Sequence, residues 1–220
     1  MKLSILVTTM PSRAAALARL IDALGFTNCP PRVMAMQNGT LTRMVNLAAS
    51  AEMIVYETAR YDGHDPALTF GAKRNVLLAN AQGQFSAFFD DDDEPHPEYV
   101  KRVVDAIDDR TDVVGFKVAC YGYAQRNGAF DRTIMEPADV SIKYDGWYND
   151  RNGFKYVRCP HHLAPTRTGL ARRIGYKEMH HGEDHEYAMR MHEAGLLRNE
   201  AYIDEFLYIY RFDAAKNMDQ

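Results

Sequence analysis

The first half of the chain alternates between short apolar segments and segments with helical spacing, and this alternation limits the fold more than any other feature. Residues 3–9, LSILVTT, are rich in residues that favour strands, and apolar side chains then recur at helical spacing from Ala14 to Leu24, before Gly25. The pattern continues with predicted strands at 32–38, 53–57, 85–90 and 112–123 and predicted helices at 41–51, 71–81 and 97–107. It predicts an α/β fold, a sandwich with a mostly parallel central sheet and helices on both faces.

The second half of the chain begins with a different pattern. Residues 122–160 are polar and aromatic, and their N-G and D-G pairs predict hairpins or a mobile loop inserted over one end of the sheet. Helices are predicted again at 166–174 and 183–195, and an apolar stretch follows at 202–210. A chain of 220 residues suits one domain with a single substantial core, so we expect residues 1–220 to form one folding unit.

The overall charge disfavours nucleic acid as a partner. The net charge is −4, and the composition, 46% hydrophobic residues, is that of a globular protein. A weakly acidic protein can still carry a local basic groove, so nucleic acid is disfavoured rather than excluded. The residues that form one basic run are Arg167, Arg172, Arg173 and Lys177.

The cysteines and the short apolar segments indicate in which cellular compartment the protein works. Cys29, Cys120 and Cys159 are odd in number and far apart, which argues against a disulfide framework and against a cysteine zinc site. The N-terminal apolar segment is too short for a signal peptide, and no stretch reaches the roughly 18 apolar residues that cross a bilayer. We therefore expect a cytoplasmic protein without a membrane span.

Four aspartates and a glutamate follow the apolar segment FSAFF at residues 85–89. Such acids repel one another unless a cation lies among them. Ligands of open α/β sheets bind beyond the carboxyl ends of the strands, and in extended backbone Asp90 and Asp92 share a face. Carboxylate oxygens suit Mg²⁺ or Mn²⁺ completed by substrate phosphates. Stabilisation of the next helix N-terminus, with Pro95 or Pro97 in its first turn, explains one or two of the acids but not four.

A second polar segment is HHGEDHEYAMRMHEAG, residues 180–195. Glu183 and Asp184 begin a predicted amphipathic helix, where the helix dipole favours ionised carboxylates. The two acids are equally consistent with an ordinary helix start. Four histidines could ligate a metal, although none has H-x-x-x-H spacing. They are His161, His162, His180 and His181.

Together these segments resemble the family 2 glycosyltransferases of the GT-A fold. SILVTTMPSR is similar to that family's first strand and nucleotide-facing loop, and GAKRNVLLANAQGQFSAFFDDDDEPHPEYV is similar to its RN, A-x-G and D-x-D-D segment. RIGYKEMHHGEDHEYAMRM is similar to its acceptor segment, which ends in E-D. The resemblance covers most of the chain in the right order and leaves 122–160 unmatched. It implies a nucleotide-sugar-binding half, 1–118, and an acceptor-side half, 119–220, with a loop or lid at 122–160.

The resemblance also implies roles for individual residues. Asp92, with Asp90, would hold Mn²⁺ or Mg²⁺, and Asp184 would be the general base, with Glu183 beside it. The residues implied to bind the donor are Thr8, Thr9, Arg13, Asn38, Lys73, Arg74, Asp90, Asp91 and Asp93. The family usually has an aspartate after its second strand that reads the base. Here the segment is MAMQNGT, so Gln37 or Asn38 would take its place, and the choice of uridine stays open.

These roles predict a metal-dependent, inverting transfer of a sugar from a nucleotide diphosphate, with UDP expected, to an acceptor hydroxyl. A base takes the hydroxyl proton while positive charge stabilises the departing diphosphate. The acceptor stays open among a glycan, a protein and a modified nucleobase. A sugar-phosphate nucleotidyltransferase is an alternative, although TTMPSRAAA lacks the glycines of its G-x-G-T-R loop. A non-catalytic module that binds nucleotide sugar or nucleic acid is another.

Overall fold

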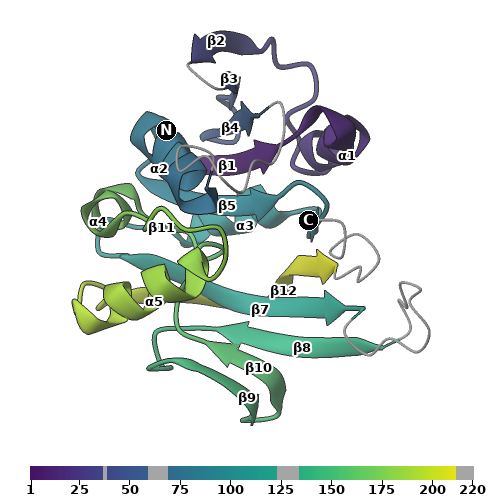
Figure 1. Cartoon of the computed structure of the whole chain (residues 1–220). Helices are drawn as coiled ribbons and strands as arrows, with labels where there is room; N and C mark the ends of the chain where they lie inside the picture. The colour runs from purple at the N-terminus through teal and green to yellow at the C-terminus, as the bar shows by residue number, and fades with distance from the viewer. Residues whose placement is uncertain (37–38, 59–68, 123–133, 212–220) are drawn as a thin grey trace.

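The computed structural model describes residues 1–36, 39–58, 69–122 and 134–211, and within them the strands form one twelve-stranded sheet (Figure 1). The main path runs β2-β3-β4-β1-β5-β11-β7-β8-β10-β9, and β12 pairs with both β7 and the short β6. The strands are β1 (Leu3–Thr9), β2 (Arg32–Met36), β3 (Gly39–Asn46), β4 (Ala51–Glu57), β5 (Phe85–Asp90), β6 (Glu94–Pro95), β7 (Val113–Tyr121), β8 (Met135–Val140), β9 (Trp147–Arg151), β10 (Phe154–Arg158), β11 (Thr166–Arg167) and β12 (Glu200–Arg211).

Helices cover both faces of the sheet, as the sequence predicts. In β1, Ile5 and Val7 belong to one buried cluster and Leu6, between them, belongs to the other, because successive side chains of a strand point to opposite faces. The first cluster includes residues of α1 and α3, and the second includes residues of α2, α4 and α5. The helices are α1 (Ala14–Ala23), preceded by the 3-10 turn η1 (Pro11–Arg13), α2 (Phe70–Asn80), α3 (Tyr99–Ala106), α4 (Thr168–Ile174) and α5 (Glu183–Glu193).

The α/β class is confirmed, but the sheet is mixed rather than mostly parallel. β1 pairs in parallel with β4 and β5, whereas β3 pairs in antiparallel order with both β2 and β4. The predicted helix at 41–51 is wrong, because β3 occupies Gly39–Asn46. Parallel strands need a long crossover, and here a direct antiparallel connection takes its place. At the start of β3 a side chain on Gly39 would lie 2.5 Å from the Tyr56 ring, so only glycine fits.

The segment expected to hold hairpins or a loop contains strands where the structure describes it. β8 pairs antiparallel with β7, and β9 and β10 form a hairpin beyond it. The turn of this hairpin contains Asn152 and Gly153, with φ of 55° and 79°, which is the left-handed backbone that the N-G pair predicts. Residues 123–133 lie outside the described residues, and the lid stays a prediction.

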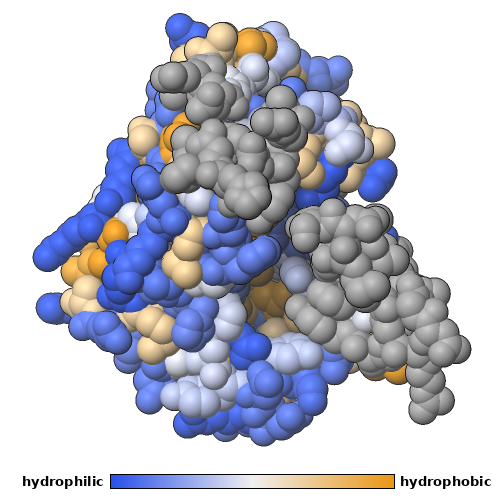
Figure 2. All heavy atoms as spheres, viewed as in Figure 1, coloured by the Kyte–Doolittle hydropathy of each residue, from blue (hydrophilic) through white to orange (hydrophobic). Residues whose placement is uncertain are grey.

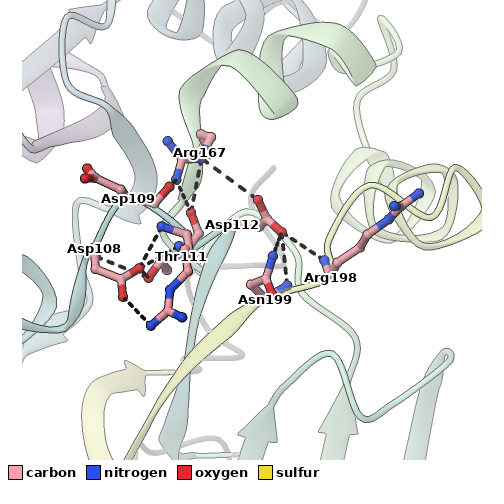
Figure 3. Close-up of polar contacts among 8 residues, drawn as sticks. Asp108, Asp109, Thr111, Asp112, Arg167, Arg198 and Asn199 are labelled. Atoms are coloured by element: carbon pink, nitrogen blue, oxygen red, sulfur yellow. Dashed lines mark hydrogen bonds and ion pairs between the residues drawn. The ribbon is translucent and has the colours of Figure 1, made fainter.

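A group of polar contacts holds the amino ends of β7, β11 and β12 together (Figure 3). One carboxylate oxygen of Asp112 accepts hydrogen bonds from the backbone of Arg198, at 3.1 Å, and of Asn199, at 3.0 Å. Arg167 donates to the carbonyl of Thr111. These contacts fix where β12 starts, and β12 then runs parallel to β7 toward the opposite edge of the sheet. In the described part of the chain, no helix is long and apolar enough to cross a membrane.

Candidate active site

A cleft of about 330 Å³ lies at the carboxyl ends of β1 and β5. The two strands are neighbours, and Thr8 at the end of β1 is in register with Asp90 at the end of β5. The cleft is where open α/β sheets bind ligands. Its lining residues are Thr8, Arg13, Phe70, Arg74, Asp90, Asp91, Asp92, Asp93, His162, His180, His181, Gly182, Glu183, Asp184, Tyr210 and Arg211.

The four aspartates all line this cleft, but they have different surroundings. Asp91 and Asp93 are buried, with 2% and 5% of their surface exposed. Asp91 accepts a 2.6 Å hydrogen bond from the Thr9 hydroxyl, and Asp93 accepts a 2.5 Å bond from the Tyr208 hydroxyl. The side chains of Asp90 and Asp92 are 36% and 31% exposed. The more accessible carboxylates are therefore the two that the sequence predicts as metal ligands.

Two arginines balance part of this negative charge. Arg13, from the turn after β1, forms ion pairs with Asp91, at 3.0 Å, and with Asp92. Arg74, in α2, is 3.1 Å from Glu183 and 3.9 Å from Asp90. Burial raises the pKa of Asp90, Arg74 opposes that rise, and the negative charges of Asp92 and Asp184 add to it. Burial also raises the pKa of Asp91, to about 6. The site therefore favours added positive charge.

The start of α2 contacts the backbone segment that precedes α5. A side chain on Gly71 would lie 1.7 Å from the carbonyl oxygen of Lys177, so glycine lets the two backbones meet. The Gly71 amide donates to the carbonyl of Met179, at 3.3 Å. This contact holds the segment that carries His180, His181 and Gly182 beside the cleft.

Asp184 lies in the first turn of α5, with 27% of its side chain exposed. One carboxylate oxygen accepts a 2.8 Å hydrogen bond from the amide of His185, and the other is 3.6 Å from Nδ1 of His162. Nδ1 of His162 is in turn 3.2 Å from Nδ1 of His161. Burial lowers the pKa of both histidines, that of His161 to about 4. Burial therefore favours the neutral form of the two imidazoles beside Asp184.

Other predicted residues have mixed positions. Thr8 lines the cleft, whereas the Thr9 hydroxyl is turned to Asp91. Lys73 is buried, with its ammonium 5.6 Å from the centre of the Phe70 ring, and it is not among the cleft-lining residues. Asn38, like Gln37, lies outside the described residues.

Sequence reasoning missed the contribution of the last strand. Tyr208 and Arg211, both in β12, bind opposite oxygens of Asp93, the former through its hydroxyl and the latter through its backbone amide, at 2.8 Å. Tyr210 and Arg211 also line the cleft. The only signal in the sequence was the apolar stretch predicted at residues 202–210. Nothing in that stretch indicates that Tyr208 would bind Asp93.

The acids fit a divalent cation that is completed by substrate. Asp90 and Asp92 are the more accessible of the four consecutive aspartates. Burial raises the pKa of Asp90, Arg74 opposes that rise, and the negative charge of Asp92 adds to it. Among the residues that the structure describes, no three His, Cys, Asp or Glu side chains are grouped as a metal site. Mg²⁺ and Mn²⁺ are commonly held by one or two carboxylates together with phosphate oxygens and water.

Comparison with known proteins decides the family. The model for glycosyl transferase family 2 matches residues 40–192. The chain belongs to this family. The family predicted from the sequence is thus confirmed. The matched residues include the four aspartates that begin at the end of β5 and the start of α5. Comparison with curated protein sequences finds no match.

Solved structures of S. aureus TarS share the fold of this family 2 chain. TarS 1-349 superposes with a TM-score of 0.57 and 18% identity, over 96% of this chain and 60% of that one. TarS 1-349 in complex with UDP-GlcNAc gives a TM-score of 0.58 and 19% identity, over 95% and 58%. A longer TarS structure gives 0.58 and 18%, over 96% and 37%. The chain therefore spans at most 60% of these TarS chains.

Proposed function

We propose that this chain is an inverting, metal-dependent glycosyltransferase that moves a sugar from a UDP-sugar to an acceptor hydroxyl. One observation carries the proposal: the cleft beyond β1 and β5 gathers the four consecutive aspartates, three arginines and Asp184. The accessible acids suit a cation with a diphosphate, and Asp184 supplies a carboxylate that can accept a proton. TarS, which has the same fold, has been solved with UDP and with UDP-GlcNAc, and this supports UDP as the donor nucleotide.

Five residues of the cleft have proposed roles in a single displacement. Asp90 and Asp92 would hold Mg²⁺ or Mn²⁺, which when bound neutralises charge on the departing diphosphate. Thr8 and Arg13 lie on the β1 side of the cleft, where they would contact the nucleotide. Asp184, which lines the cleft on the α5 side, takes the proton of the acceptor hydroxyl as that oxygen attacks the anomeric carbon. Attack opposite the leaving group inverts the anomeric centre.

Glu183 has a supporting role in this proposal. Its carboxylate forms a buried ion pair with Arg74, which also faces Asp90 and is stacked 4.9 Å from the centre of the Phe88 ring. Glu183 thereby holds the Arg74 guanidinium beside the acids, and Asp184, its neighbour, is left as the base. The cytoplasmic location stays a prediction from the cysteine pattern.

A thermal-shift panel tests the proposed function. UDP-sugars, GDP-sugars and the free nucleotides are each added with Mn²⁺ and with EDTA. A ligand at about 100 times its dissociation constant adds about 2.7 kcal/mol to the free energy of unfolding. We expect UDP and at least one UDP-sugar to stabilise the chain only when Mn²⁺ is present. On incubation with the chain, the stabilising UDP-sugar should slowly release UDP. Stabilisation without UDP release, even with acceptors present, would favour a non-catalytic nucleotide-sugar-binding module.

A further inference from the structure

A second cavity, of about 260 Å³, adjoins the cleft. It lies among β7, β8, the β9–β10 hairpin and the segment that begins at His161. His162, Asp184 and Tyr210 line both cavities, so the proposed base faces the donor cleft on one side and this second cavity on the other. A molecule in the second cavity would therefore also meet Asp184.

Several walls of this cavity are apolar. They consist of the largely buried side chains of Val118, Cys120, Ala138, Val140 and Leu163. The polar side chains His162, Asp184 and Tyr210 lie on the side shared with the cleft. Figure 2 shows hydrophobic atoms at the bottom of a hollow in one face of the molecule. A sugar with several hydroxyls would lose water here without gaining hydrogen bonds from the apolar walls.

The remaining walls are flat and held in place. The guanidinium of Arg158 lies 4.9 Å from the centre of the Trp147 ring and 5.1 Å from that of Tyr156. It donates to the carbonyls of Tyr148, at 2.6 Å, and Val157, at 2.9 Å. Flat aromatic and guanidinium surfaces attract flat rings, and surfaces that are already ordered lose little freedom on binding.

We propose that the second cavity binds the acceptor, and that this acceptor carries its hydroxyl on, or one carbon away from, a planar and largely apolar ring. The inference rests on the proposed glycosyl transfer and names its acceptor class. In the step, the acceptor oxygen forms a bond to the anomeric carbon, and the bond from that carbon to the diphosphate oxygen breaks. Its electron pair leaves with the diphosphate, and the hydroxyl proton passes to Asp184.

The chain offers a specific reporter for this cavity, because Trp147 is its single tryptophan. Tryptophan emission is titrated with three alcohols: benzyl alcohol, cyclohexylmethanol, which has the same carbon count without the planar ring, and methyl glucoside. We expect benzyl alcohol to change the emission and to bind about 3- to 10-fold more tightly than cyclohexylmethanol, because aromatic contacts add to area burial. Methyl glucoside should leave the emission unchanged. Equal or stronger binding of methyl glucoside would overturn the inference.

A pair of tyrosine variants separates the cavity from the rest of the hairpin. Tyr156→Ala removes a flat wall and should weaken benzyl alcohol binding about 10-fold. Tyr148→Ala is the matched control, because Tyr148 is exposed, lies on the same hairpin and does not line the cavity. Unchanged benzyl alcohol binding in Tyr156→Ala would count against the proposal. Both variants should bind UDP with Mn²⁺ as the parent does, which shows that they are folded.

The outcomes distinguish this inference from the proposed function. Benzyl alcohol glycosylated by the UDP-sugar supports both. If the donor binds with Mn²⁺ and releases UDP but only sugar alcohols accept the transfer, the acceptor class is wrong and the transferase activity stands. If uridine displaces benzyl alcohol from the cavity, the cavity belongs to the nucleoside and the inference fails. If benzyl alcohol binds but no nucleotide does, the proposed function fails, whereas the assignment of planar-ring alcohols to the second cavity stands.

Discussion

Replacing Asp184 by asparagine should separate catalysis from stability. The Asp184 carboxylate accepts one 2.8 Å hydrogen bond, from the His185 amide in the first turn of α5, and asparagine can keep it. The N-cap of α5 is Gly182, so the change at Asp184 costs mainly the charge–dipole interaction, which is worth about 0.3–1 kcal/mol. The free energy of unfolding should therefore fall by less than about 1 kcal/mol. The transfer rate should fall about 10²- to 10⁴-fold, a barrier increase of about 2.7–5.4 kcal/mol.

The assay compares three quantities for Asp184→Asn and for a matched control. They are the free energy of unfolding in urea, the affinity for UDP with Mn²⁺, and the rate of sugar transfer at saturating donor. Glu193→Gln is the control, because Glu193 is exposed at the other end of the same helix and lines neither cavity. An Asp184→Asn chain that transfers sugar at near the parent rate would refute the assignment of the base. A large loss of UDP affinity would instead place Asp184 in donor binding.

Two further predictions concern buried groups of the site. Glu183→Leu should lower the free energy of unfolding, measured by urea titration, by about 3–5 kcal/mol. The reason is that the buried Arg74 cation loses its nearer partner. A loss below about 1 kcal/mol would mean that the Arg74–Glu183 ion pair contributes little to stability. Burial lowers the pKa of His161 to about 4, so between pH 7 and pH 4 the unfolded chain binds more protons than the folded chain does. The free energy of unfolding should therefore fall as the pH is lowered from 7 to 4. His161→Phe should remove about 3 kcal/mol of that fall, measured as unfolding free energy against pH, and an unchanged pH profile would contradict the buried neutral state.

Local sequence signals were sufficient for the parts of the fold in which pattern and packing agree. The apolar run before Asp90 is buried and extended, and the acids follow it at the edge of the sheet, as strand polarity requires. The segment 41–51 misled because Leu41, Met44 and Val45 also satisfy helical spacing. In the structure Leu41 and Met44 are buried in opposite clusters, and pairing with two neighbouring strands decides the conformation.

The candidate site was only partly predictable, because its side chains come from distant segments. The position of the acids directly after a strand indicated that Asp90 and Asp92 lie at the edge of the sheet. Tyr208, which binds Asp93, lies in β12, 115 residues away in the sequence. Glu183 and Asp184 are neighbours in sequence, yet one forms a buried ion pair with Arg74 and the other lines both cavities. Such differences depend on long-range packing, which no local pattern records.

Calorimetric titration of UDP into the chain and into its Asp92→Asn variant, each with Mn²⁺ and with EDTA, tests the central claim most directly. Arg13 and Arg74 balance only part of the negative charge that Asp90 and Asp92 place in the cleft, so without a metal ion these acids disfavour a diphosphate. We expect clear binding of UDP with Mn²⁺, at least about tenfold weaker binding in EDTA, and a similar loss in Asp92→Asn with Mn²⁺ present. A tenfold loss corresponds to about 1.4 kcal/mol. Equal UDP affinity with Mn²⁺ and with EDTA in the parent chain would contradict this claim.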